Sequence, residues 1–162
     1  MSKCARDSLI VRCSTSADET QLRNLLYHTV HSVNQGDYDQ AQLDAWAPTA
    51  MLTEHWPARQ GERLTWVAEQ DGQIAGFAEL KPDGQIDCFY CHHHYQRQGI
   101  GNRLFKQLLE HARVIGIKRL FVDSSITARP FFQRLGFSSG RPRLVTIRGQ
   151  KLMNFRMSIK VD

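Results

Sequence analysis

At positions 95 to 102 the sequence reads Tyr95-Gln96-Arg97-Gln98-Gly99-Ile100-Gly101-Asn102, and this stretch joins a β-type run to a strongly amphipathic helix. Glycine allows the backbone to bend sharply and to approach a ligand closely. The N–H groups in the first turn of a helix point toward an anion, which the positive end of the helix dipole also attracts. The stretch therefore predicts either a plain tight turn or a loop that binds phosphate.

The spacing of the glycines excludes two common phosphate-binding loops. A dinucleotide-binding Gly-x-Gly-x-x-Gly motif would need glycine at position 104, where the chain has Leu104. The Gly-x-x-x-x-Gly-Lys-Ser/Thr loop of nucleoside triphosphatases occurs nowhere in the sequence. The pattern that remains is Gln96-x-x-Gly99-x-Gly101.

Upstream of this loop, two Asp-Gly pairs divide the sequence into short β-type runs. The pairs are Asp71-Gly72 and Asp83-Gly84, and each is a good hairpin turn because glycine tolerates positive φ. They predict an antiparallel meander of three strands over residues 64–69, 73–80 and 85–91. Further upstream we expect a strand at residues 9–13, a helix that begins near Asp18 and a second helix between Asp39 and Pro48. Residues 50–63 are expected to form helix and loop.

Downstream of the loop, apolar residues recur on one face of a helix that Gly116 is well placed to end. A buried strand at residues 117–122, a short helix at 127–135 and closing strands near 143–147 and 155–161 are expected to follow. This order predicts an α+β fold of three layers, α/β/α. Helices flank a mixed, mostly antiparallel central sheet.

Length and composition favour one globular domain over residues 1–162, with 41% hydrophobic and 23% charged residues. No apolar stretch is long enough for a signal peptide or a membrane span, so we expect a cytoplasmic protein. The net charge of +5 favours an anionic partner: nucleic acid, a membrane surface or a phosphorylated cofactor. Because the basic residues are spread out, without a run of five or six, nucleic acid is the weakest of these.

A second segment, about 30 residues further on, reads Ala128-Arg129-Pro130-Phe131-Phe132-Gln133-Arg134-Leu135-Gly136-Phe137. It resembles the Ala-x-x-Phe-Tyr/Phe-x-x-x-Gly-Phe segment of the GNAT N-acetyltransferases. The loop resembles their pyrophosphate-binding motif, Arg/Gln-x-x-Gly-x-Gly/Ala. The resemblance extends from Leu9 to Lys160 and is nearest to a bacterial, YafP-like branch, through Ala45-Trp46-Ala47-Pro48 and residues 95–101 and 126–132.

This resemblance implies an acyltransferase that moves the acetyl group of acetyl-CoA to a primary amine of a small molecule or peptide. A catalytically silent acyl-CoA-binding or regulatory module is the alternative. The resemblance implies a monomer or homodimer that uses no metal, no nucleic acid and no membrane. In the family, the pantetheine arm pairs with the edge of the strand that here ends at Cys91. The implied coenzyme contacts are Phe89, Tyr90, Cys91, Gln96, Arg97, Gln98, Gly99, Ile100, Gly101, Asn102, Ser125 and Phe132.

The residues for catalysis match the family less well. Many relatives protonate the departing thiolate with a tyrosine, and this chain has Phe132 at that position. The family's usual asparagine corresponds to Ser125, whose hydroxyl is a candidate to bind the pantetheine or a water. For a general base the chain offers Glu79, Asp87, His28, His31 and His92. We rank Glu79 first because its strand walls the substrate channel in the family; a solvated strand carboxylate is the alternative.

Aromatic residues are the candidates for the acceptor pocket, because aromatic walls suit flat or amphipathic amines. They are Tyr38, Trp46, Trp56 and Tyr90. A metal site built on Cys88 and Cys91 is not expected, because residues three apart on a strand point to opposite faces.

Overall fold

The computed structural model of this chain describes residues 8–54 and 62–162. Seven strands form one sheet in the order β1-β2-β3-β4-β5-β7-β6. The strands are β1 (Leu9–Cys13), β2 (Leu64–Gln70), β3 (Gln73–Leu80), β4 (Gln85–Cys91), β5 (Arg119–Ser125), β6 (Ser138–Ile147) and β7 (Gln150–Lys160). The helices are α1 (Glu19–Val33), α2 (Gln40–Trp46), α3 (Ile100–Ile115) and α4 (Arg129–Arg134), with short 3-10 turns at Ser16–Asp18, Asn34–Gly36 and Thr49–Leu52. The predicted α+β class is confirmed.

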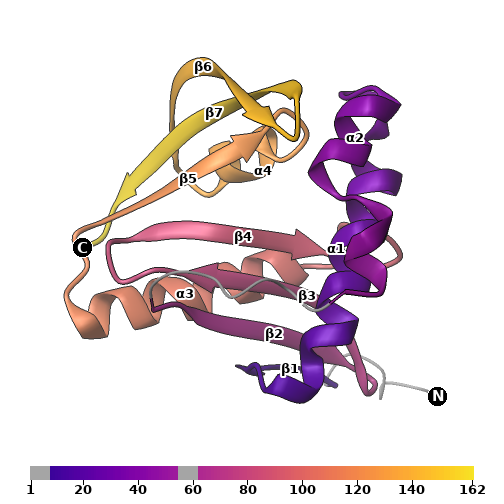
Figure 1. Ribbon diagram of the computed structural model, residues 1–162. Helices are drawn as coiled ribbons and strands as arrows, with labels where there is room; N and C mark the ends of the chain where they lie inside the picture. The colour runs from indigo at the N-terminus through magenta and orange to yellow at the C-terminus, as the bar shows by residue number, and fades with distance from the viewer. Residues whose placement is uncertain (1–7, 55–61) are drawn as a thin grey trace.

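Two hydrophobic cores lie on opposite faces of the sheet, so the predicted three layers are present (Figure 1). The first core lies under α3 and α4 and includes Leu104, Leu108 and Phe132. The second lies under α1 and α2 and includes Val30 and Leu43. Full burial of a side chain of this size contributes about 1.5–3 kcal/mol. The cores thus hold helices against both faces, and we call these the α3/α4 face and the α1/α2 face.

Both predicted Asp-Gly turns are present. Asp71 and Gly72 have positive φ angles of 53° and 80°, and the flanking residues Gln70 and Gln73 pair directly. Two consecutive left-handed residues are what a two-residue hairpin requires. At the second turn Gly84 has a φ of 98°.

The boundaries of the last three strands differ from the prediction. β6 begins at Ser138 and β7 at Gln150, rather than near residues 143 and 155. The first five residues of β6 are all exposed, so they lack the alternation that marks a strand. β5 begins at Arg119 rather than at residue 117, because the Ile117 N–H still donates to Ala112 O and closes α3.

Residues 50–63 were expected to form helix and loop, and part of that segment lies outside the described residues. Within the described part, Thr49–Leu52 forms a 3-10 turn. The prediction for the rest of the segment stays a prediction.

β4 and β5 are parallel neighbours over a very short distance. Gln85 pairs with Phe121 and Ile86 with Val122, and the register between these two strands ends there. Beyond that point β4 stays paired with β3 as far as Cys91, and β5 stays paired with β7 as far as Ser125. The two strands therefore diverge, as Figure 1 shows, and we call this divergence the fork.

Gly84 holds the closed end of the fork. Its carbonyl oxygen accepts a hydrogen bond from Phe121 N at 3.1 Å. A Cβ at this position would lie 2.2 Å from the backbone oxygen of Arg119, closer than real atoms come. Only glycine therefore fits where β4 and β5 are brought together.

We predict that Gly84→Ala destabilises the protein by about 2–4 kcal/mol, since a left-handed alanine costs about 1–2 kcal/mol and the overlap with the Arg119 backbone adds a similar amount. Gly72→Ala is the matched control, because Gly72 also has a positive φ but nothing lies within 4 Å of its missing Cβ. Urea unfolding of both variants measures the difference. Equal losses in the two variants would show that the close approach at Gly84 is unimportant.

Candidate functional site

The loop from β4 to α3 exposes backbone N–H groups at the start of a long helix. Gly99 is the residue just before α3 and has a φ of 82°. Arg97 is also left-handed, with a φ of 59°. Among the residues that the structure describes, the N–H groups of Ile100, Gly101 and Asn102 donate to no protein acceptor. Such a row of N–H groups at a positive helix end favours an anion.

The side chain of Gln96 fastens this loop to the end of β4. Gln96 Nε2 donates to Cys91 O at 2.7 Å and lies 3.4 Å from His92 O. Thr29 of α1 also donates, through Oγ1, to Cys91 O at 3.1 Å. The Gln96 side chain therefore shapes the loop from within, which leaves the backbone N–H groups to meet the ligand.

Gly101 has a packing role in addition to the coenzyme role predicted for it. A Cβ at Gly101 would lie 2.9 Å from two ring atoms of Phe131 and 3.6 Å from Cys91 Sγ. The absence of a side chain lets the first turn of α3 approach α4. Gly99 differs, because nothing lies within 4 Å of its missing Cβ. Gly99 is therefore required for its backbone conformation alone.

The backbone of β4 alternates between β3 and the fork. The His92 N–H donates to Ala75 O of β3 at 2.8 Å, so alternation directs the backbone groups of Tyr90 toward β3 and those of Phe89 and Cys91 toward the fork. The two predicted pantetheine contacts at Phe89 and Cys91 thus fit this geometry. The backbone of Tyr90, predicted as a coenzyme contact as well, faces the other way.

The side chain of Tyr90 lies on the α1/α2 face with two other predicted acceptor residues. Trp46 Nε1 donates to Tyr90 Oη at 3.1 Å, and the rings of Trp46 and Tyr38 are 5.5 Å apart. Burial raises the pKa of Tyr90 far above its ordinary value. Tyr90 therefore stays a neutral phenol. Trp56, the fourth predicted aromatic, lies outside the described residues.

Tyr38 links the two halves of the structure. Its hydroxyl donates to Met153 O of β7 at 2.7 Å and accepts from Ile126 N, just after β5, at 2.9 Å. Only 6% of the residue is exposed, and burial raises its pKa. These contacts fix the segment between α1 and α2 to the far side of the fork.

Phe132 and Ser125 lie beside the fork, on α4 and β5. Phe132 is buried, with its ring 5.6 Å from that of Phe89, whose backbone faces the fork. Ser125 Oγ accepts from Ala128 N at 3.0 Å and so shapes the turn into α4. The coenzyme roles expected for these two residues stay predictions.

Carboxylates gather at the start of the fork on the α1/α2 face. Glu79 is only 1% exposed, so the alternative of a solvated strand carboxylate is wrong. An irregularity of pairing between Glu79 and Leu80 brings Asp87 of β4 close to it. Arg63 contacts both carboxylates, and Lys81 Nζ lies 3.8 Å from Asp87. The cluster thus consists of buried Glu79 and its neighbour Asp87, with Arg63 and Lys81 in contact with these carboxylates.

Among residues 8–54 and 62–162, one group of side chains is close enough to share a metal ion. Glu79, Asp87 and Cys88 have ligand atoms within 4.8 Å of one another. However, the Arg63 guanidinium already contacts both carboxylates, and a second cation there would be repelled. Cys88 packs on the α1/α2 face and Cys91 on the α3/α4 face. This confirms that the two thiols cannot chelate one ion together.

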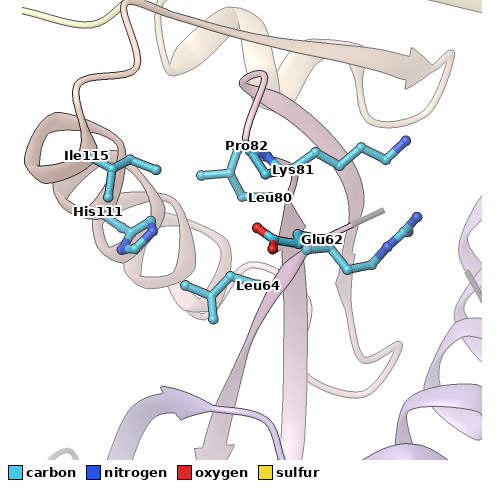
Figure 2. A pocket seen from close by; sticks show the side chains of 8 residues that line it. Glu62, Leu64, Leu80, Lys81, Pro82, His111 and Ile115 are labelled. Carbon is cyan, nitrogen blue, oxygen red and sulfur yellow. The ribbon is translucent and has the colours of Figure 1, made fainter. Parts of the chain in front are cut away.

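A separate cavity lies at the opposite end of α3 (Figure 2). It has a volume of about 450 Å³ and is lined by Glu62, Arg63, Leu64, Leu80, Lys81, Pro82, His111 and Ile115. α3 has 16 residues, and a helix rises 1.5 Å per residue, so Ile115 lies about 20 Å or more from the loop. The cavity is therefore distinct from the loop that joins β4 to α3.

Comparison with known proteins identifies the family. The family model for the acetyltransferase (GNAT) domain matches residues 34–158 of this chain. The chain belongs to the GNAT acetyltransferase family. It is similar to YafP of Escherichia coli (strain K12), described as an uncharacterized N-acetyltransferase, with 29% identity over 154 residues that cover 95% of this chain and 97% of YafP. The predicted acyltransferase class and the resemblance to YafP are confirmed.

Solved structures share the GNAT fold. A GCN5-related N-acetyltransferase from Rhodopseudomonas palustris has a TM-score of 0.86 and 27% identity, and the match covers 98% of this chain and 99% of that one. The PaiA N-acetyltransferase from Thermoplasma acidophilum, solved in complex with coenzyme A, has a TM-score of 0.74 and 18% identity, with 94% and 99% of the chains covered. In the described residues of the present chain, no helix is long and apolar enough to cross a membrane.

Three consecutive histidines, His92, His93 and His94, follow the end of β4. No coenzyme role was assigned to them from the sequence. His92 and His93 stack with ring centroids 4.4 Å apart, and the His94 N–H donates to His92 Nδ1 at 3.0 Å. Burial lowers the pKa of His92 and of His93, and the neighbouring histidines add to this. Protonation of His92 at Nδ1 would break the hydrogen bond to His94.

We predict that the protein loses stability as the pH falls below about 6.5, the ordinary histidine value. A histidine whose pKa is lowered by folding binds more protons in the unfolded state, so acid favours unfolding. The pKa values of Asp18 and Asp123 are also lowered, but aspartates change the stability only below about pH 4, where they bind protons in the unfolded chain. Urea unfolding between pH 7 and pH 5 measures the effect, and His92→Gln with His93→Gln should flatten the slope. An unchanged slope in the double variant would contradict it.

Proposed function

We propose that this chain transfers the acetyl group of acetyl-CoA to a primary amine of a small molecule or peptide, and that residues 1–162 form one N-acetyltransferase domain. The observation that carries the proposal is the fork beside the loop. The register of β4 with β5 ends after Ile86 and Val122, where the edge of β4 becomes available to a ligand. The loop after β4 leads to the N-terminus of α3, where backbone N–H groups are available to a ligand. An extended arm that ends in a pyrophosphate matches both features.

The coenzyme would bind beside the start of α3, because the loop that would hold its pyrophosphate leads into that helix. Its pyrophosphate would accept hydrogen bonds from the N–H groups between Arg97 and Asn102, and the exposed Arg97 would add positive charge. The pantetheine arm would pair with the backbone groups of Phe89 and with the N–H group of Cys91, whose carbonyl oxygen already accepts from Gln96 and Thr29. The thioester would then reach the α1/α2 face, and the amine would meet it there.

Acetyl transfer requires a neutral amine, since only the free lone pair attacks the thioester carbon. The amine nitrogen forms the new C–N bond, the C–S bond breaks, and a proton moves from nitrogen to a base. Glu79 is our candidate for that base, either directly or through a water, and Asp87 is its near neighbour. Both lie where β4 and β5 begin to diverge.

The leaving thiolate needs a proton, or stabilisation until water supplies one. Phe132 has no acidic proton, so the chain lacks a phenol at this position. The Ser125 hydroxyl oxygen is engaged by Ala128 N, but its own hydrogen remains available to the sulfur or to a water. A thiolate is a good leaving group, so a missing acid would cost at most about 10²–10⁴-fold in rate.

The proposal involves no metal ion, no nucleic acid and no membrane. The supporting argument is that acetyl transfer from a thioester needs none of them. We further propose a cytoplasmic monomer or homodimer that meets its acceptor in solution.

The proposed activity is tested by thiol release from acetyl-CoA in the presence of a panel of amines, with mass spectrometry of the acetylated product. We expect acetylation of at least one class of primary amine, at a rate that depends on acetyl-CoA. Tight binding of acetyl-CoA without product from any amine would favour the catalytically silent module. Failure to bind acetyl-CoA would contradict both.

We predict that Gly99→Ala weakens acetyl-CoA binding by about 5- to 30-fold, because a left-handed alanine costs about 1–2 kcal/mol and the loop relaxes away from the binding conformation. Gly149→Ala is the matched control. Gly149 has nearly the same φ, 81° against 82°, and equally open surroundings, but it lies in the β6–β7 turn. Titration calorimetry with acetyl-CoA should show the loss only for Gly99→Ala. Equal affinities in the two variants would overturn the loop assignment.

A further inference from the structure

Three charged side chains meet on the far side of the fork from Glu79. Asp123 is the first residue of β5 beyond its last register pair with β4. Arg156 of β7 donates to Asp123 through Nε at 2.6 Å and Nη2 at 3.0 Å. Arg143 of β6 reaches the same carboxylate through Nη2 at 3.0 Å. We call Asp123, Arg143 and Arg156 together the arginine triad.

Strand alternation places the arginine triad on the α1/α2 face. Leu120 and Val122 of β5 are buried in the core under α3 and α4, so Asp123, the residue after Val122, points the opposite way. Arg156 pairs directly opposite Asp123. In the proposed function, this is the face from which the amine approaches the thioester.

Both arginines keep hydrogen-bond donors for a ligand. Their side chains are 40% and 46% exposed, against 25% for Asp123. A guanidinium has five N–H donors. Arg156 spends two of them on Asp123, and Arg143 uses one there and one at 3.4 Å from Asn154 Oδ1. Three donors on each arginine therefore form no hydrogen bond within the described residues.

The arginine triad is held rigidly and carries a net positive charge. The Arg156 guanidinium lies over the Phe121 ring, 5.0 Å from its centroid. Burial opposes ionisation of Asp123, but the hydrogen bonds and charges of Arg156 and Arg143 hold its pKa below the ordinary value. Asp123 is thus an anion that orients two cations, and the negative charge of Asp83 also attracts Arg156, so the group carries at most one net positive charge. A fixed guanidinium pair of this kind suits a carboxylate.

We propose that Arg143 and Arg156 bind the carboxylate of an acceptor whose primary amine lies close to that carboxylate, as in a free amino acid. Asp123 is the positioning residue of this subsite. The proposal rests on the proposed function, which places the amine on the same face. A net charge of at most +1 suits a carboxylate better than a phosphate monoester, which carries about −1.5 to −2. Glu79 and Asp87 lie on the other side of the fork, where Arg63 and Lys81 already contact them, so the amine end of such an acceptor would face carboxylates whose charge is already balanced.

The test compares the standard L-amino acids with their carboxamides as acceptors at saturating acetyl-CoA. We expect the carboxylates to be the better substrates. Arg143→Gln and Arg156→Gln should each raise the KM of the preferred amino acid by about 10- to 100-fold, the loss expected for charge-assisted hydrogen bonds. The KM of its carboxamide and of acetyl-CoA should stay unchanged. Arg141→Gln is the control, since Arg141 lies on the same strand and forms no ion pair within the described residues.

A binding measurement separates failure of the arginine triad from failure of the proposed function. Ligand-observed NMR with the CoA-saturated protein compares N-acetyl amino acids with their carboxamides, and needs no turnover. Selective binding of the carboxylates, lost in Arg143→Gln, supports the triad even if no amine is acetylated. Acetylation of amides and amino acids with equal KM, or equal binding of the two N-acetyl series, overturns the triad and leaves the acetyltransferase proposal intact. A preference for phosphoethanolamine over every amino acid would overturn the choice of a carboxylate.

Discussion

The whole arrangement depends on how briefly β4 and β5 pair. A sheet normally satisfies the N–H and C=O groups of neighbouring strands along their full length. Here the shared register ends after Ile86 and Val122, and Gly84 allows the tight join that precedes the divergence. The groups of β4 that lose their strand partner are those a coenzyme arm can take up. The two hydrophobic cores stabilise the divergence, because each half of the sheet keeps its own helices.

The fork also explains why charge is distributed as it is around the candidate site. On one side Arg63 and Lys81 neutralise Glu79 and Asp87. On the other side two arginines outweigh Asp123. Asp123 can remain ionised in its partly buried place because two guanidinium groups contact it. The carboxylate of an acceptor would find the opposite charge at the two arginines, whereas its amine would face carboxylates that cations already neutralise.

Most of the fold could be predicted because local signals were strong. The two Asp-Gly turns and the amphipathic helix from Ile100 to Ile115 are determined by short-range preferences, and the glycine loop between them indicated an anion site. The strands β6 and β7 were harder, because an exposed strand half lacks alternation and an Arg-Gly turn is a weak signal. The packing role of Gly101 against Phe131 could not be predicted, because it depends on contacts across 30 residues of sequence. The arginine triad was missed for the same reason: its members come from three strands that only the folded sheet brings together.

The most direct test of this account is amide hydrogen exchange of the protein with and without acetyl-CoA. If the pantetheine arm pairs with the free edge of β4 and the pyrophosphate with the helix start, exchange should slow at Phe89, at Cys91 and from Arg97 to Asn102. Amides of Tyr90 and of β3 should change little, since Tyr90 is paired with β3 and β3 is paired with β2 and β4. Protection confined to the cavity beside His111 and Ile115, with none along β4 or the loop, would contradict the account.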